Sequence, residues 1–190
     1  MYWNFGGLLR GPRDARFSRA DGGLVVEIGF GNGEYLAHLA GANPDSTAVG
    51  IEVSQWCIAK AARRALAMGR LNVRLLHGDA RYLLRAAFEP ECVRAIYMNF
   101  PCPWPKKRHA GRRVATPDFA RLISSRLFPG GTFTLATDVG WYAEETREIF
   151  AGCAGFEAET AEGVAGLGCG TKYERKWSSM GRDTHMVVAK

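Results

Sequence analysis

The sequence is 190 residues long, which fits one domain, and its 47% hydrophobic and 23% charged residues are ordinary for a soluble globular protein. No apolar run of about 18 residues predicts a membrane span, the N-terminus lacks the apolar core of a signal peptide, and the five cysteines form no CxxC pair typical of a zinc site or disulfide framework. We therefore expect a cytoplasmic protein without metal or membrane, and its net charge of +6 favours an acidic partner such as nucleic acid.

Residues 1–21 form the first distinct region, which is rich in glycine and arginine. Four arginines recur at three-residue spacing: Arg10, Arg13, Arg16 and Arg19. We interpret this region as a basic N-terminal arm and residues 22–190 as a single domain. The arm either touches a nucleic acid or is a solvated chain end, and the sequence leaves both interpretations open.

Apolar segments and helical periodicities then alternate along the chain. Apolar runs predict strands at residues 24–28, 48–53, 73–76, 93–98 and 132–137, and two further short strands at 156–160 and 185–189. Helical spacing and capping signals predict helices at 34–40, 55–68, 82–88, 117–128 and 140–150. Ser54 and Thr116 are predicted N-caps, and Asp138 is a candidate for a third. Strands that alternate with helices are typical of an α/β fold with a parallel sheet and helices on both faces.

The first strand runs into a glycine loop, Gly29-Phe30-Gly31-Asn32-Gly33, and then into a helix. Glycine tolerates positive φ and lets a backbone approach a ligand closely. The N–H groups at the start of the helix favour a carboxylate or a phosphate. The spacing G-x-G-x-G differs from the dinucleotide fingerprint G-x-G-x-x-G. One nucleoside with a short charged tail therefore fits better than a dinucleotide, which favours S-adenosylmethionine over a nicotinamide or flavin cofactor.

Polar residues stand at the carboxyl ends of the first four strands: Glu27, Glu52, Asp79 and Asn99. Ligands of open parallel sheets bind just outside these ends. Glu52 follows the glycine loop at a distance of about 20 residues, which suits an acceptor for ribose hydroxyls. Asp79 suits an acceptor for an amine such as that of adenine. A surface carboxylate would also explain Glu52, and a helix cap would also explain Asp79.

A proline loop follows the fourth strand, with a proline at every second position from Pro101 to Pro105. Because proline fixes φ and biases the preceding residue towards extended geometry, we expect the loop to leave the sheet stiffly and to present Cys102 and Trp104 beyond its edge. A basic run comes next: Lys106, Lys107, Arg108, Arg112 and Arg113. No acidic residue lies between Glu91 and Asp118 to neutralise it. The basic run of this loop is therefore predicted to bind a polyanion.

Together these features resemble the bacterial tRNA (guanine-N7-)-methyltransferases. The matching segments are Glu27-Ile28-Gly29-Phe30-Gly31-Asn32-Gly33, Gly50-Ile51-Glu52-Val53, Asp79-Ala80, residues 99–109, Ala136-Thr137-Asp138 and Thr171-Lys172-Tyr173-Glu174-Arg175. The resemblance implies a Rossmann-like class I methyltransferase fold, with a seven-stranded, mostly parallel sheet whose last strand is antiparallel. It also implies methyl transfer from S-adenosylmethionine to N7 of a guanosine in the variable loop of tRNA.

The resemblance further implies which residues contact each ligand. The expected cofactor contacts are Glu27, Gly29, Gly31, Gly33, Glu52, Asp79, Asn99 and Cys102. The expected contacts to the guanosine and its RNA strand are Lys106, Arg108, His109, Arg112, Arg113, Asp138, Thr171, Lys172, Tyr173 and Glu174. Trp104 either stacks on a splayed guanine or packs beneath the proline loop, and His109 either contacts the RNA or faces solvent.

Cys102 departs from the family, which has an aspartate at this position that is usually assigned as catalytic. Guanine N7 is already a lone pair, so its methylation needs no prior deprotonation, and positioning alone can supply effective molarities of about 10⁵–10⁸ M. A carboxylate would stabilise the cationic product ring better than a thiol would. Three interpretations stay open: a slower enzyme, a substitute carboxylate from Asp138 or Glu174, or a protein that binds tRNA without methylating it.

We therefore expect an enzyme, an S-adenosylmethionine-dependent tRNA (guanine-N7-)-methyltransferase, whose partner is tRNA. One alternative is a catalytically weak or inactive tRNA-binding protein of the same fold. The other is a small-molecule methyltransferase, which would need no basic grip. The sequence does not distinguish a monomer from a homodimer.

Overall fold

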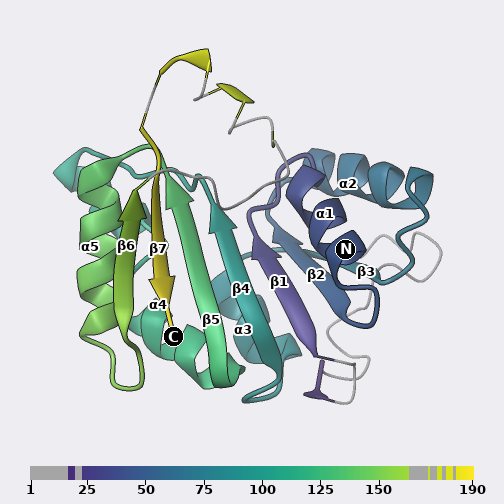
Figure 1. The fold of residues 1–190 in the computed structure, drawn as a ribbon, viewed down its shortest axis with the longest axis horizontal. Helices are drawn as coiled ribbons and strands as arrows, with labels where there is room; N and C mark the ends of the chain where they lie inside the picture. The colour runs from purple at the N-terminus through teal and green to yellow at the C-terminus, as the bar shows by residue number, and fades with distance from the viewer. Residues whose placement is uncertain (1–16, 20–22, 163–170, 172–174, 177–178, 182) are drawn as a thin grey trace.

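The computed structural model describes residues 17–19, 23–162, 171, 175–176, 179–181 and 183–190, and within these residues one sheet forms the centre of the molecule (Figure 1). Its strands are β1 (Leu24–Ile28), β2 (Thr47–Glu52), β3 (Val73–His77), β4 (Val93–Asn99), β5 (Leu127–Thr137), β6 (Ala158–Glu162) and β7 (His185–Ala189). Their spatial order is β3-β2-β1-β4-β5-β7-β6.

The sheet is parallel from β3 to β5, whereas β7 is antiparallel to both of its neighbours, β5 and β6. The seven-stranded, mostly parallel sheet with an antiparallel last strand is therefore confirmed. The chain builds outwards from β1 in one direction to β3 and then continues from β4 in the other direction. The carboxyl ends of β1 and β4 consequently flank the point at which the strand order reverses, where ligands of open α/β sheets bind.

Helices connect the strands and begin largely where the capping signals predict. They are α1 (Glu34–Ala42), α2 (Gln55–Ala67), α3 (Ala80–Ala87), α4 (Pro117–Arg126) and α5 (Gly140–Ala151), with a short 3₁₀ helix, η2 (Lys107–Arg112), after the proline loop. The Ser54 side chain accepts a hydrogen bond from the N–H of Cys57, and that of Thr116 accepts one from Phe119. Both predicted N-caps are thus confirmed. The N-cap of α5 is Val139 rather than Asp138.

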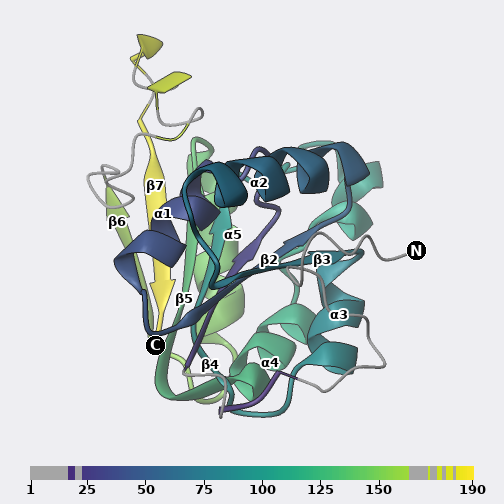
Figure 2. The same ribbon diagram turned by 90° about the vertical axis from the view of Figure 1, so that its right-hand side faces the viewer.

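Helices cover both faces of the sheet (Figure 2). Because side chains alternate along each strand, each face contributes to its own hydrophobic cluster. On β1, Leu24, Val26 and Ile28 belong to the cluster that includes α3, α4 and α5. Val25 belongs to the other cluster, with α1 and α2. Glu27 shares the second face with Val25 and is the first position in β1 at which that face becomes polar. The expected helices on both faces are confirmed.

One predicted boundary is wrong by several residues. The helix expected to reach residue 128 ends at Arg126, and β5 begins at Leu127 rather than at residue 132. Leu127 pairs with Val93, and the register then shifts before the next pair. Gly130, at φ 82°, lets the chain continue as an irregular strand instead of a separate turn. All other predicted boundaries lie within two residues of the observed ones.

Phe17 lies within the stretch expected to be an arm, yet it belongs to the core. Its ring is 2% exposed and stacks on Phe88 with 4.9 Å between ring centroids. Its N–H donates to the carbonyl of Ala87, and its own carbonyl accepts from Glu89. The domain therefore includes residues upstream of 22. Residues 1–16 and 20–22 lie outside the described residues, so the arm stays a prediction there.

Candidate active site

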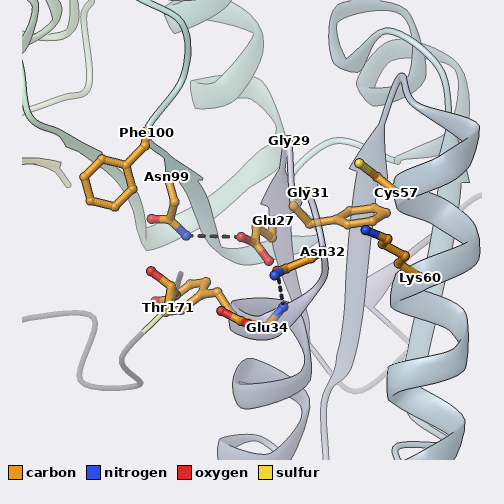
Figure 3. A pocket seen from close by; sticks show the side chains of 12 residues that line it. Glu27, Gly29, Gly31, Asn32, Glu34, Cys57, Lys60, Asn99, Phe100 and Thr171 are labelled. Atoms are coloured by element: carbon orange, nitrogen blue, oxygen red, sulfur yellow. Dashed lines mark hydrogen bonds between the residues drawn. The ribbon is translucent and has the colours of Figure 1, made fainter. Parts of the chain in front are cut away.

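A pocket of about 230 Å³ opens at the carboxyl ends of β1 and β4. The residues around it are Glu27, Gly29, Phe30, Gly31, Asn32, Glu34, Tyr35, Cys57, Lys60, Asn99, Phe100 and Thr171. Figure 3 shows Glu27 in the middle, with Asn99 and Phe100 on the β4 side and Cys57 and Lys60 on the side of α2. The strand-end position of Glu27 and Asn99, the glycine loop and Thr171 were predicted, and the structure brings them together.

Glu27 is a carboxyl group buried inside the pocket, with 2% of its surface exposed. The Asn99 side-chain N–H donates to Glu27 Oε1 at 3.2 Å. Glu27 Oε2 and Asn99 Oδ1 are both buried, and neither has a hydrogen-bond partner within the part of the chain that the structure describes. Burial raises the pKa of Glu27 from 4.5 to about 8, although the Asn99 bond opposes the rise, and the negative charge of Glu52 adds to it. Two buried acceptors that lack donors favour a ligand that brings donors or positive charge.

The glycines of the loop have two different roles. Gly29 and Gly31 line the pocket at φ values of 73° and 55°, and a Cβ on either would meet no atom within 4 Å. Gly33 lies at the start of α1, where a Cβ would lie 2.6 Å from the Cβ of Ala61 on α2. Gly33 is therefore needed for close packing of α1 on α2, and it does not line the pocket. Its expected contact with a cofactor stays a prediction.

Glu52 joins the end of β2 to the glycine loop. Its Oε2 accepts a hydrogen bond from the N–H of Gly31 at 3.1 Å, and its Oε1 accepts from Val53 and Ser54 at 2.8 and 3.0 Å. The residue is partly exposed. A carboxylate has about four lone-pair sites, so these bonds leave room for a further donor. Glu52 is thus more than a surface carboxylate, because it fixes the loop whatever else it binds.

Asp79 is the N-cap of α3, so the helix-cap explanation of this residue is confirmed. It accepts from the N–H of Arg81 at 2.8 Å, and its Oδ2 lies 2.6 Å from Arg81 Nη2. The hydrogen bonds from Arg81 hold the pKa of Asp79 below its ordinary value. Asp79 is exposed and does not line the pocket, and its expected contact with a cofactor stays a prediction.

Several pocket residues were not identified from the sequence. They are Phe30, Asn32, Glu34, Tyr35, Cys57, Lys60 and Phe100. Cys57 and Lys60 are three positions apart on α2 and therefore lie on the same face of that helix. That face turns towards the glycine loop only because of the packing of α2, which the sequence does not reveal. Phe30 and Asn32 are the non-glycine positions of the glycine loop, and the glycine spacing alone does not indicate that their side chains line a pocket.

The proline loop is strained at two positions outside glycine. Phe100 has φ 50° and Trp104 has φ 45°, in a region that residues with a Cβ rarely adopt. The N–H of Phe100 donates to the carbonyl of Ala136 at 2.7 Å, which ties the start of the loop to β5. The guanidinium of Arg112 lies 4.9 Å from the centre of the Trp104 ring, and the His109 ring contacts it edge-on at 5.7 Å. Trp104 is thus packed against the basic run that follows it.

The basic run divides into exposed and engaged residues. The exposed cations are Lys106, Lys107, Arg108 and Arg112, and His109 is half-buried. The Arg113 side chain is only 15% exposed and forms an ion pair with Glu145 on α5 at 2.7 Å. Arg113 was expected to contact RNA like the others, but its guanidinium is held inside the protein.

The remaining expected substrate residues are placed as follows. Asp138 directly follows β5, the neighbour of β4, and is half-buried at the same edge of the sheet. Thr171 is buried and lines the pocket, and its carbonyl accepts from the N–H of Arg175 at 2.9 Å. Lys172, Tyr173 and Glu174 lie outside the described residues, and their roles stay predictions.

Cys102 is exposed and follows the last residue of β4 by three positions. It does not line the pocket, although Asn99 and Phe100 just before it do. Across the described ranges, no three His, Cys, Asp or Glu side chains gather where they could hold a metal ion. No helix in the same part of the chain is long and apolar enough to span a membrane.

Comparisons with known sequences agree with this geometry. The family model Methyltransf_4, described as "Putative methyltransferase", matches residues 21–187. A Thermotoga maritima protein named tRNA (guanine-N(7)-)-methyltransferase is 44% identical over 167 residues, which cover 88% of this chain and 53% of that protein. A Nitrosococcus oceani protein of the same name is 40% identical over 157 residues, covering 83% of this chain and 66% of the relative. The chain thus spans between about half and two thirds of the length of these relatives.

Solved structures share the fold at low sequence identity. The 16S rRNA methyltransferase KamB superposes with a TM-score of 0.66 at 19% identity and covers 90% of this chain and 88% of its own. An rRNA methylase from Streptococcus thermophilus gives a TM-score of 0.62 at 20% identity, covering 90% of this chain and 87% of its own. The Rossmann-like class I methyltransferase fold expected from the sequence is confirmed.

Proposed function

The chain belongs to the methyltransferase family that the Methyltransf_4 model describes, and from this premise we propose that it transfers a methyl group from S-adenosylmethionine to N7 of a guanosine in the variable loop of tRNA. The observation that supports the proposal most directly is the pairing of two features at one edge of the sheet. The pocket with its unpaired buried acceptors suits a cationic nucleoside cofactor, and the basic run beside it suits an RNA strand. The cytoplasmic location expected from the sequence belongs to the same proposal.

The pocket residues fit the functional groups of S-adenosylmethionine. Glu27 Oε2 and Asn99 Oδ1 are buried acceptors without donors among the described residues, and an ammonium group supplies donors and positive charge together. Glu52 has lone pairs left for ribose hydroxyls after it has accepted the N–H of Gly31. Gly29 and Gly31 leave open space above the backbone, so a ligand can approach it closely. When bound, the cofactor supplies a methyl group on a sulfonium.

On the substrate side, the protein needs to orient a base rather than remove a proton from it. N7 of guanine is a lone pair, so the reaction depends on holding this atom in line with the methyl group, and orientation accounts for much of such a rate. The strained, proline-stiffened loop after β4 suits that role. Asp138, at the same edge of the sheet, is the described carboxylate that we assign to stabilise the ring as it becomes cationic.

In this proposal, the exposed cations of the loop bind the phosphates of the RNA. Lys106, Lys107, Arg108 and Arg112 face solvent and are free of described acidic partners within an ion-pair distance, since the ion pairs of the described residues involve other cations. Four phosphate contacts give a slope of log affinity against log salt of roughly −2.8, at −0.7 for each contact to single-stranded RNA. A small-molecule methyltransferase would show no such slope.

The proposal is tested by resolving the methylated nucleoside. Unmodified tRNA and labelled S-adenosylmethionine are incubated with the protein, the tRNA is digested, and the nucleosides are separated. We expect label in 7-methylguanosine, with none in a matched tRNA whose variable-loop guanosine is replaced by adenosine. Label in another nucleoside would overturn the assignment of the position. Bound tRNA and bound cofactor without any label would instead support the tRNA-binding protein without activity.

A further inference from the structure

We propose that Arg113 is a positioning residue for the proline loop rather than a contact to RNA. This inference rests on the proposed function, because the loop that Arg113 holds is the one that would present the guanosine. We define the Arg113 clamp as the Arg113 guanidinium, the carboxylate of Glu145 and the backbone carbonyls of Pro103 and Trp104.

The guanidinium of Arg113 has five N–H donors and makes four hydrogen bonds within the protein. Its Nε donates to the Pro103 carbonyl at 3.2 Å, and its Nη2 donates to the Trp104 carbonyl at 3.2 Å. Its Nη1 donates to both carboxylate oxygens of Glu145, at 2.7 and 2.9 Å. The Cζ atom of the guanidinium also lies 4.9 Å from the centre of the Trp141 ring. A phosphate would have to displace these partners, which makes Arg113 a poor RNA contact.

The loop needs such an external partner because its own backbone has few donors. Proline has no N–H, so every second residue from Pro101 to Pro105 lacks one. Trp104 also has a φ of 45°, a strained conformation that persists only where the surroundings enforce it. The Arg113 clamp binds the carbonyl of this strained residue and the carbonyl before it. Tertiary contacts, and not the prolines alone, therefore set the path of the loop.

The other end of the clamp is fixed by a helix that belongs to the core. Glu145 lies on α5, where Tyr142 and Phe150 are fully buried. Glu145 is 32 positions from Arg113 in the sequence, so the clamp connects the loop after β4 to the helix after β5. A rigid element thus holds the segment that directly follows the pocket residues Asn99 and Phe100.

The neighbouring arginine provides a contrast within the same run. Arg112 is exposed and contacts the face of Trp104 without any hydrogen bond among those found in the described residues. A cation in this position remains accessible to a phosphate. The clamp hypothesis therefore assigns neighbouring arginines to different tasks: Arg112 to the RNA strand and Arg113 to the loop.

The test compares Arg113→Lys and Glu145→Gln with Arg112→Lys and Arg112→Ala. Lysine keeps the charge at position 113 but cannot form the planar fork that reaches two carbonyls and a carboxylate. We expect kcat of Arg113→Lys to fall roughly 10–100-fold, the loss expected for a small misplacement of reacting groups. Cofactor affinity and the salt slope of tRNA binding should stay at their unaltered values. Arg112→Ala should instead lower the magnitude of the salt slope by about 0.7, the value of one contact, while Arg112→Lys keeps it.

Glu145→Gln provides the second test of the clamp, because it leaves Arg113 in place and removes only the charge of its ion-pair partner. We expect a reduced kcat here as well, and the double variant with Arg113→Lys should be no slower than Arg113→Lys alone, since the two residues act as one unit. The matched control is Arg147→Lys, which alters an exposed ion pair with Glu144 on the same helix and should leave kcat unchanged.

Hydrogen exchange gives a readout that does not depend on activity. In peptides that cover residues 100–113, exchange should be faster in Arg113→Lys and Glu145→Gln and unchanged in Arg112→Lys, with peptides of β1 unaffected. Unchanged exchange and unchanged kcat in both clamp variants would overturn the proposal. A fall of about 0.7 in the magnitude of the salt slope in Arg113→Ala, which removes the charge, would overturn it as well. If the unaltered protein forms no 7-methylguanosine, the proposed function fails, whereas the exchange experiment still decides whether the clamp exists.

Discussion

Two loops meet at the same edge of the sheet, and they are built by different means. The glycine loop after β1 adopts its path because three glycines permit positive φ and because Glu52 accepts the N–H of Gly31. The proline loop after β4 has positive φ at Phe100 and Trp104, where the residue type opposes it, and is held by Arg113 and Glu145. The first loop depends mainly on its own glycines, with one anchor on the neighbouring strand β2, whereas the second is anchored to a helix 32 positions further along the chain.

The contrast suggests that the glycine loop serves cofactor binding and the proline loop serves positioning of the substrate. A loop built from glycines offers space and backbone N–H donors, which suits a cofactor shared by many enzymes. A loop that depends on specific long-range contacts can be tuned to one substrate. Substitutions in the first loop should therefore affect cofactor affinity and stability, and substitutions that loosen the second should affect the rate.

The largest effect on cofactor binding is expected from Glu27→Gln, at the end of β1 just before the first loop. Gln keeps the size and hydrogen-bonding capacity of the protonated carboxyl but cannot become an anion. Because hydrogen bonds to charged groups contribute about 1.5–3 kcal/mol, S-adenosylmethionine should bind roughly 10–100-fold more weakly by calorimetry. Asn99→Asp alters the hydrogen-bond partner of Glu27 instead and should not raise the Tm at pH 8. Unchanged affinity in Glu27→Gln would remove this residue from the cofactor site.

The same variant should be more stable than the unaltered protein in the absence of cofactor. The folded-state pKa of Glu27 is raised to about 8 from an ordinary value of 4.5. The contribution of Glu27 to the free energy of unfolding is therefore complete below about pH 4.5 and is lost as the pH rises towards 8, since this carboxyl ionises first in the unfolded state. At pH 8 the Tm of Glu27→Gln should exceed that of the unaltered protein by at least ~2–4 °C, the shift expected for 1 kcal/mol in a domain of this size. Equal Tm values at pH 8 would contradict the raised pKa.

A smaller effect separates two glycines of the first loop. Gly33→Ala places a Cβ 2.6 Å from Ala61 Cβ at a residue with φ 73°, so strain and overlap add. The loss of stability should be about 2–4 kcal/mol by urea denaturation. Gly31→Ala, at φ 55° with open space around its Cβ, should lose only about 1–2 kcal/mol but should weaken cofactor binding. If Gly31→Ala were the less stable variant, the packing role of Gly33 would be wrong.

The two loops also differ in how far the sequence predicted them. The glycine loop, the strand-end residues Glu27 and Asn99, and the parallel order of strands follow from local patterns, and the structure places them as expected. The engagement of Arg113 by Glu145 could not be predicted, because a basic run looks the same whether or not one of its members faces a helix encoded 32 positions later. The pocket residues on α2 were missed for the same reason, since their orientation depends on packing.

The measurement that tests the central claim most directly is the single-turnover rate of 7-methylguanosine formation by the unaltered protein, by Cys102→Asp and by Cys102→Ala. The claim is that the pocket and the held loop perform the transfer by positioning, and that a carboxylate at position 102 is dispensable. We predict product from all three proteins, with Cys102→Ala close to the unaltered rate and Cys102→Asp faster. Product from Cys102→Asp alone would contradict this account, because the binding apparatus would then be intact while its chemistry requires the missing carboxylate.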